Sequence, residues 1–171
     1  MPTWQELAAE KKARQTASIP KEWLITLPAD DVLDVTDVPA KCGLLSARDL
    51  EITTISDSDV TVLLQKLATG EWSSVEVTTA FCKRAIIAHQ VVRSITNFIC
   101  QLVGSLIPTR SVSSFQTNCL TEIFIDRALE RAAWLDEQLK LTGKVVGPLH
   151  GLPISLKDQI CIKGLETTMG A

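Results

Sequence analysis

Two long amphipathic segments, residues 73–90 and 125–143, place the tightest limits on the fold of this chain. In the first, Ser73 and Glu76 have the spacing of a helix capping box, and apolar residues then recur with a helical period. In the second, Asp126 stands near the start and Gly143 follows the last apolar turn. Such a helix is stable mainly through the packing of its apolar face. We therefore expect both segments to be helices whose apolar stripes form the core.

Shorter helices and one irregular stretch precede these two segments. Residues 4–16 are rich in Ala, Glu, Lys and Arg and predict a helix. Ser46 is placed to cap a short helix, and residues 56–69 show an apolar helical stripe. Residues 18–45 contain three prolines and an acidic patch, which is typical of irregular structure. We expect that stretch to lie over the helices as a wrapping arm.

Composition and charge exclude several classes of protein. Apolar residues make up 46% and charged residues 22% of the 171 residues, as in one globular domain. The net charge of -3 offers no basic surface for nucleic acid. The N-terminus lacks the apolar core of a secretory signal, and the longest apolar stretch, near Ile95–Ile107, is too short to span a bilayer. We expect a cytoplasmic protein with no nucleic-acid or membrane partner.

The cysteines and histidines predict neither a metal site nor a disulfide framework. The five cysteines are widely spaced and form no Cys-x-x-Cys pair. His89 and His150 stand far apart, and neither belongs to a metal-binding pattern. We interpret the cysteines as free thiols that are mostly buried, and we expect no metal or cofactor.

The segment Val92 to Gln116 does not match its neighbours. It has 25 residues without one acidic side chain, and its only charges are Arg93 and Arg110. A loop of this length without structure is uncommon in a compact domain. Every valine codon begins with GT, and Phe-Gln can be encoded as TTY-CAG, so the segment has the ends expected of an unremoved intron. We interpret residues 92–116 as a retained-intron insert; a long surface loop is the alternative.

The sequence GPLHGLPISLKD, residues 147–158, carries the one candidate for chemistry. Ile154 and Leu156 alternate with Ser155 and Lys157, as in a strand with one apolar face. A lysine among apolar neighbours loses hydration, so its pKa falls and the neutral amine can accept a proton from a serine. The pattern alone also fits a solvated turn in which Lys157 pairs with Asp158. It does not fit a phosphate-binding loop, because no G-x-x-x-x-G-K-[ST] is present.

This segment resembles the lysine block of the amidase signature family. Members of that family carry G-P-L-x-G-[IVL]-P-[IV]-x-x-K-D followed by K-G-x-x-T-T-x-G, and this chain reads GPLHGLPISLKDQICIKGLETTMG. Upstream, IPKEWL, CGLLSARDLEIT, GEWSSVEVTTAFCKRA and NCLTEIFIDRALERA are similar to the fungal acetamidase-type branch. The resemblance covers nearly the whole chain except residues 92–116. The matching block positions are Gly147, Pro148, Leu149, Gly151, Pro153, Lys157, Asp158, Lys163, Gly164, Thr167, Thr168 and Gly170.

The resemblance implies an α/β fold, in which helices flank a mixed sheet, and the hydrolysis of small-molecule amides to an acid and ammonia or an amine. This chain would form a mainly helical portion of that fold with one or two strands. The implied catalytic set is a lysine, a serine in a cis peptide linkage and a second, nucleophilic serine, with no cofactor. The match places the lysine at Lys157 and gives Asp158 the role of orienting the lysine end of the strand. Ser155 is not a position that the family uses as a nucleophile.

One departure from the family pattern limits this interpretation. The family's two serines lie downstream in a Gly-Gly-Ser-Ser-Gly-Gly block, and the sequence reaches Ala171 before such a block. We expect a truncated N-terminal portion of an amidase that is inactive alone. The alternative is a non-catalytic binding module or pseudogene product derived from an amidase. The expected parts of this partial domain are an N-terminal arm at 1–45, helices at 46–91, the insert at 92–116, and a helix with the lysine strand at 117–171.

Overall fold

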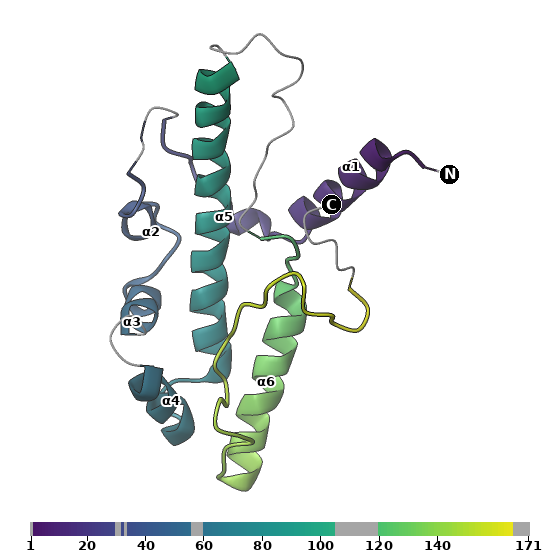
Figure 1. Cartoon of the computed structure of the whole chain (residues 1–171). Helices are drawn as coiled ribbons and strands as arrows, with labels where there is room; N and C mark the ends of the chain where they lie inside the picture. Colours follow the sequence, from purple (N-terminus) through teal and green to yellow (C-terminus); the bar gives the residue numbers. More distant parts are fainter. Residues whose placement is uncertain (1, 30–31, 33, 56–59, 105–119, 166–171) are drawn as a thin grey trace.

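The computed structural model describes residues 2–29, 32, 34–55, 60–104 and 120–165, and only the backbone of residues 92–104. The elements are helices (Figure 1): α1 (Trp4–Ala17), the 3-10 turn η1 (Lys21–Trp23), α2 (Val38–Lys41), α3 (Ala47–Ile55), α4 (Val60–Thr69), α5 (Ser74–Gly104) and α6 (Ile125–Thr142). Within these described ranges, no helix combines the length and the apolar character needed to cross a membrane.

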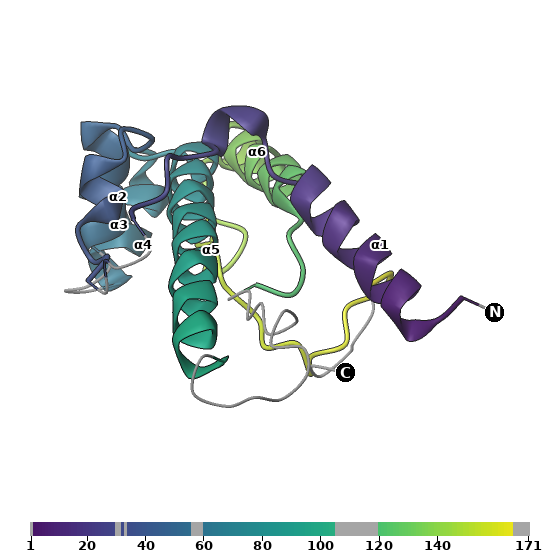
Figure 2. The same ribbon diagram turned by 90° about the horizontal axis from the view of Figure 1, so that it is seen from above.

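Helix α5 is the central element of the fold. The α2–α4 helices lie on one side of it and α1 on the opposite side, while α6 runs beside its N-terminal half (Figures 1 and 2). Side chains of α5 take part in three packed apolar clusters. The buried α5 members of these clusters are Val77, Ala80, Ile86, Ile87 and Val91. The two clusters around Ile86 and Ile87 also include residues of the N-terminal arm, so α5 packs against this arm as well as against the other helices.

The irregular arm is held along α5 by both apolar and polar contacts. Trp23 is buried against Ile86. The amide of Gln90 donates to the Trp23 carbonyl oxygen at 3.0 Å and accepts from the Ile25 N–H at 3.1 Å. Because the donor and the acceptor of one side chain are both used, Gln90 fixes the direction in which the arm crosses the helix.

Predicted caps are present at several helix ends. The Ser46 hydroxyl accepts from the Asp49 N–H at 3.0 Å, and the Ser73 hydroxyl accepts from the Glu76 N–H at 3.0 Å. Gly143 adopts φ +67° after α6, and its N–H donates to the Leu139 carbonyl at 2.8 Å. The sequence signals for these helix ends are therefore confirmed.

Three expectations were wrong. The helix expected over 73–90 continues to Gly104, since the sequence has no glycine or proline from Ser74 to Val103 to end it. The strand expected over residues 153–157 is absent, and the described part of the chain contains no strand. A strand needs a hydrogen-bonded neighbour, and no described segment pairs with this one. The described cysteines are free as expected, but Cys42 and Cys82 are half-buried and Cys161 is exposed.

Candidate active site

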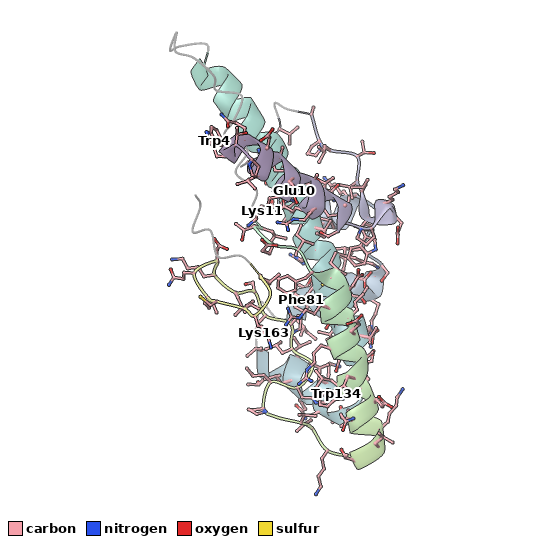
Figure 3. All side chains as sticks on the ribbon, turned by 90° about the vertical axis from the view of Figure 1, so that its right-hand side faces the viewer. Trp4, Glu10, Lys11, Phe81, Trp134 and Lys163 are labelled. Carbon is pink, nitrogen blue, oxygen red and sulfur yellow. The ribbon has the colours of Figure 1, made fainter. Side chains whose placement is uncertain are left out.

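The lysine-bearing segment returns from the end of α6 toward the middle of the molecule. After Gly143 the chain reverses and makes two turns, with His150 N–H donating to the Gly147 carbonyl at 3.1 Å and Leu152 N–H donating to the Leu149 carbonyl at 3.2 Å. The segment then passes α6 and loops out below α1 with Lys163 on it (Figure 3). The glycines and prolines of residues 147–153 thus lie in two tight turns that direct the chain to Lys157.

Gly151 is the anchor point of this segment. It has φ +75°, and a Cβ on it would lie 2.5 Å from Ser74 Oγ and 2.9 Å from Leu67 Cδ2. Only glycine combines this left-handed backbone with so close an approach to a neighbouring helix. The segment is therefore packed directly on the start of α5.

His150 lies beside this anchor and is buried. Its Nδ1 accepts a hydrogen bond from the Val146 N–H at 3.2 Å, so Nδ1 carries no proton in this arrangement. The side chain therefore closes the turn that precedes Gly151.

An open cavity of about 590 Å³ lies between α5, α6 and two irregular segments, residues 120–124 and 151–165. Its walls are mostly apolar. The apolar side chains of its walls include Ala85, Ile86, Ile123, Ala128, Ala132, Leu135 and Leu152. Ser155, Lys157 and Asp158 also line it, so the three polar residues singled out in the lysine block border one cavity.

Asp158 is hydrogen-bonded to the other irregular segment that lines the cavity. Thr121 Oγ1 donates to Asp158 Oδ1 at 3.4 Å. The segment that carries Thr121 is held by α1, because the Gln15 amide donates to the Leu120 carbonyl at 2.5 Å and Lys11 pairs with Glu122 at 2.8 Å. The N-terminal helix therefore supports the acidic residue next to Lys157.

Lys157 itself is exposed, which corrects the expectation of a lysine enclosed by apolar neighbours. Its neighbours Ile154 and Leu156 are 65% and 47% exposed, because no described part of the chain covers them. Burial of this lysine would require further apolar surface over the segment.

Cys82 is the thiol in the cavity wall. Burial raises the pKa of this thiol, and the thiolate is the reactive form of a cysteine. Cys82 is therefore a poor nucleophile, and we assign it to packing.

The residues that support the site were not found from the sequence. Thr121 and Gln15 each contact a segment far away along the chain; Gln15 and Leu120, for example, are 105 positions apart. A polar residue on an amphipathic helix carries no local signal of a distant partner. The spacing of helix caps could not have revealed them.

Comparisons with known proteins agree with the motif. The profile of the family described as Amidase matches residues 109–171. The chain is 48% identical over 169 residues to the acetamidase of Emericella nidulans, covering 98% of this chain and 25% of that protein. It is 45% identical over 175 residues to an amidase of Gibberella moniliformis, covering 98% of this chain and 28% of the relative. Fatty acid amide hydrolase has a similar solved structure, with a TM-score of 0.67 and 33% identity over 91% of this chain and 24% of that one.

These similarities define a helical portion of an amidase-type α/β fold. Residues 109–171 match the Amidase family, and nearly the whole chain is similar to acetamidases, amidases and fatty acid amide hydrolase, which supports the family resemblance and the fold class expected from the sequence. It spans about a quarter of the length of these relatives.

Proposed function

We propose that this chain supplies the catalytic lysine of an amidase that hydrolyses small carboxylic amides. The observation that carries the proposal is the position of Lys157: the residue that matches the family's lysine lies at the end of the Gly151-anchored segment and lines the cavity between α5 and α6. The similarity of the segment to acetamidases supports the same role.

In the proposed reaction, Lys157 acts as a base in a serine relay. Its neutral amine takes a proton from the bridging serine, which in turn deprotonates the nucleophilic serine. The nucleophile attacks the amide carbonyl, the C–N bond breaks with release of ammonia or an amine, and water then hydrolyses the acyl-serine to the acid. Backbone N–H groups would stabilise the oxyanion. This electrostatic stabilisation is often the largest contribution to the rate enhancement in such catalysis.

Asp158 would orient the backbone and side chain next to Lys157. Its hydrogen bond from Thr121 supports this role, since that contact restrains the lysine end of the segment. Neither serine of the relay matches a residue of this sequence, so the proposed activity requires the part of an amidase that this chain does not match. We place the reaction in the cytoplasm.

The first test is an assay of the purified chain alone. We expect no ammonia release from acetamide or benzamide above that of the Lys157→Ala variant, because Lys157 has no serine nucleophile to activate. Turnover that Lys157→Ala abolishes would overturn this expectation, and a Ser155→Ala variant would then show whether Ser155 is the nucleophile.

A further inference from the structure

Helix α1 takes little part in the apolar core. None of its described side chains is buried, and none belongs to the three apolar clusters around α5. A helix in a folded protein is normally held by the burial of an apolar face. The contacts that tie α1 to the rest of the chain are instead polar, and their position indicates what the helix does.

Two polar side chains on one face of α1 contact the same short segment. Lys11 and Gln15 are four positions apart, so both project from one side of the helix. The Gln15 amide donates to the carbonyl oxygens of Leu120 and Thr121, at 2.5 and 3.3 Å, and Lys11 pairs with Glu122 at 2.8 Å. Helix α1 thus holds three consecutive residues of a segment that has no regular structure of its own.

The segment held by α1 in turn contacts the turn that begins at Lys157. The Ile160 N–H donates to the Lys157 carbonyl oxygen at 2.9 Å, which closes a turn over residues 157–160 that we call the lysine turn. Within this turn, Asp158 Oδ1 accepts from Thr121 Oγ1 at 3.4 Å. The Thr121 hydroxyl therefore joins the lysine turn to a part of the chain that α1 keeps in place.

We infer that Gln15 and Thr121 are positioning residues for Lys157. Gln15 fixes the main chain at Thr121, and the Thr121 hydroxyl holds the lysine turn through Asp158. The inference rests on the proposed function, because a lysine requires this placement only if it acts as a base. A base has to lie within hydrogen-bond reach of the proton that it takes, and a displacement of about 1 Å can lower a rate about 100-fold. A purely stabilising role fits α1 less well, because the helix buries no described side chain.

The first test measures amide hydrogen exchange in the full chain by NMR. Thr121→Val and Gln15→Leu should each raise the exchange rate of the Ile160 N–H about threefold or more, as expected when one hydrogen bond is lost. The Gly143 N–H, which closes the C-terminal end of α6, should exchange at its original rate in both variants. The double variant should behave like Thr121→Val alone, since both changes act through one contact.

Two further variants serve as controls for this measurement. Thr36→Val is matched to Thr121→Val, because the Thr36 hydroxyl also donates to an aspartate, Asp34, but in the N-terminal arm. We expect it to leave the exchange of the lysine turn unchanged. Thr121→Ser keeps the hydroxyl and should preserve the slow exchange of the Ile160 N–H.

The second test measures catalysis in a hybrid enzyme, in which this chain replaces the matched part of the Emericella nidulans acetamidase. We expect Thr121→Val to lower kcat for acetamide about tenfold and to leave KM nearly unchanged, because misplacement of a base slows the chemical step without weakening substrate binding. Thr121→Ser should restore kcat, and Thr36→Val should not change it.

The outcomes separate positioning from stability and from the chemistry. Unchanged exchange at Ile160 overturns the inference, and so does an equal rise at Gly143, which would show a general loss of stability. Additive effects of the two changes, or a wild-type kcat in the Thr121→Val hybrid, overturn it as well. A hybrid that hydrolyses no acetamide, or whose hydrolysis survives Lys157→Ala, overturns the proposed function, while the exchange at Ile160 still decides whether Thr121 holds the turn. A lower kcat together with faster exchange at Ile160 alone supports both.

Discussion

The carboxylate of Asp136 on α6 accepts a hydrogen bond from the main-chain N–H of Ser74, the first residue of α5, at 2.6 Å. Its second oxygen accepts from the N–H of Val75 at 3.1 Å. The first N–H groups of a helix have no partner within it, and a negative charge there also interacts favourably with the helix dipole. A side chain of α6 thus caps α5 and fixes the end of the helix on which Gly151 packs.

We predict that Asp136→Ala destabilises the chain by about 2 kcal/mol, since loss of a helix cap costs ~0.5–2 kcal/mol and a hydrogen bond to a charged group contributes ~1.5–3 kcal/mol. Asp136→Asn should lose less, because one amide oxygen can still accept. Urea denaturation followed by circular dichroism measures the free energy of unfolding. Glu137→Ala, at the exposed neighbouring position, is the control, and an equal effect of both alanine variants would contradict the capping role.

Gly151→Ala should be more harmful than an ordinary glycine substitution. A left-handed backbone costs a non-glycine residue ~1–2 kcal/mol, and overpacking adds ~1–3 kcal/mol. The added Cβ would meet Ser74 Oγ and Leu67 Cδ2, so we expect a total loss of about 3 kcal/mol. Gly43→Ala is the matched control, because Gly43 has φ +77° but no atom within 4 Å of its would-be Cβ.

The free energy of unfolding of both variants can be compared in the same urea titration. A loss in Gly43→Ala as large as in Gly151→Ala would mean that backbone strain alone, without crowding, explains the effect. Partial recovery of stability in the Gly151→Ala, Ser74→Gly double variant would identify Ser74 as the source of the crowding.

The local signals in the sequence predicted the helices well and the contacts between them poorly. Ser73 caps α5 as expected, but the carboxylate of Glu76 accepts from Arg48 at 2.8 Å instead of closing the capping box. In α6, Ala132 is buried, whereas Leu141, near the C-terminal end of the same helix, is 72% exposed. Period gives the direction of a side chain, but it does not tell how far along the helix a neighbour extends.

In the lysine block too, the local motif predicts some features, whereas others depend on the surrounding parts of the fold. The motif at residues 147–158 singled out Ser155, Lys157 and Asp158, and these three residues line one cavity. The motif did not predict the exposure of Lys157, because burial depends on what packs over Ile154 and Leu156 and not on those residues themselves. A strand likewise requires a neighbour, and no local pattern supplies one.

Asp49 makes the stability of the chain depend on pH in the acid range. Burial disfavours its charged form, but hydrogen bonds from Lys83 and Ser46 outweigh that effect and hold the pKa of Asp49 below its usual value. Because the folded-state pKa is the lower one, the resulting stability is fully present above the unfolded-state pKa of about 3.9 and is lost as the pH falls through the folded-state pKa.

We therefore expect the free energy of unfolding to decrease as the pH falls below about 4, and the part due to Asp49 to be absent in Asp49→Asn. At pH 7, Asp49→Asn should cost about 1.5–3 kcal/mol through weakened hydrogen bonds. Urea titrations of both proteins at a series of pH values give the comparison. Parallel pH profiles for the two proteins would show that other carboxylates cause the acid sensitivity.

Deletion of residues 92–116 tests the proposal that this segment is an insert. Val91 is the last residue of α5 whose side chain the structure describes, and it is buried in a cluster with Ile87. Ile86 packs in the same cluster as Ile125 at the start of α6, so the two ends to be joined lie near each other. After deletion, residues 117–124 would connect them. Eight extended residues span up to about 26 Å, whereas the rise of α5 from Ile86 to Val91 is only about 7.5 Å.

We predict that the deleted protein keeps the free energy of unfolding of the full chain to within about 1 kcal/mol, because the described apolar core is retained and a change in the length of a connection alters its closure entropy only slightly. A variant in which a Gly-Ser linker of equal length replaces residues 92–116 separates the effect of chain length from that of side-chain contacts. A loss of several kcal/mol in both variants would mean that these residues pack into the fold and are not an insert. Sequencing of transcripts gives an independent test, since messages that lack the codons for 92–116 are expected if the segment is an intron.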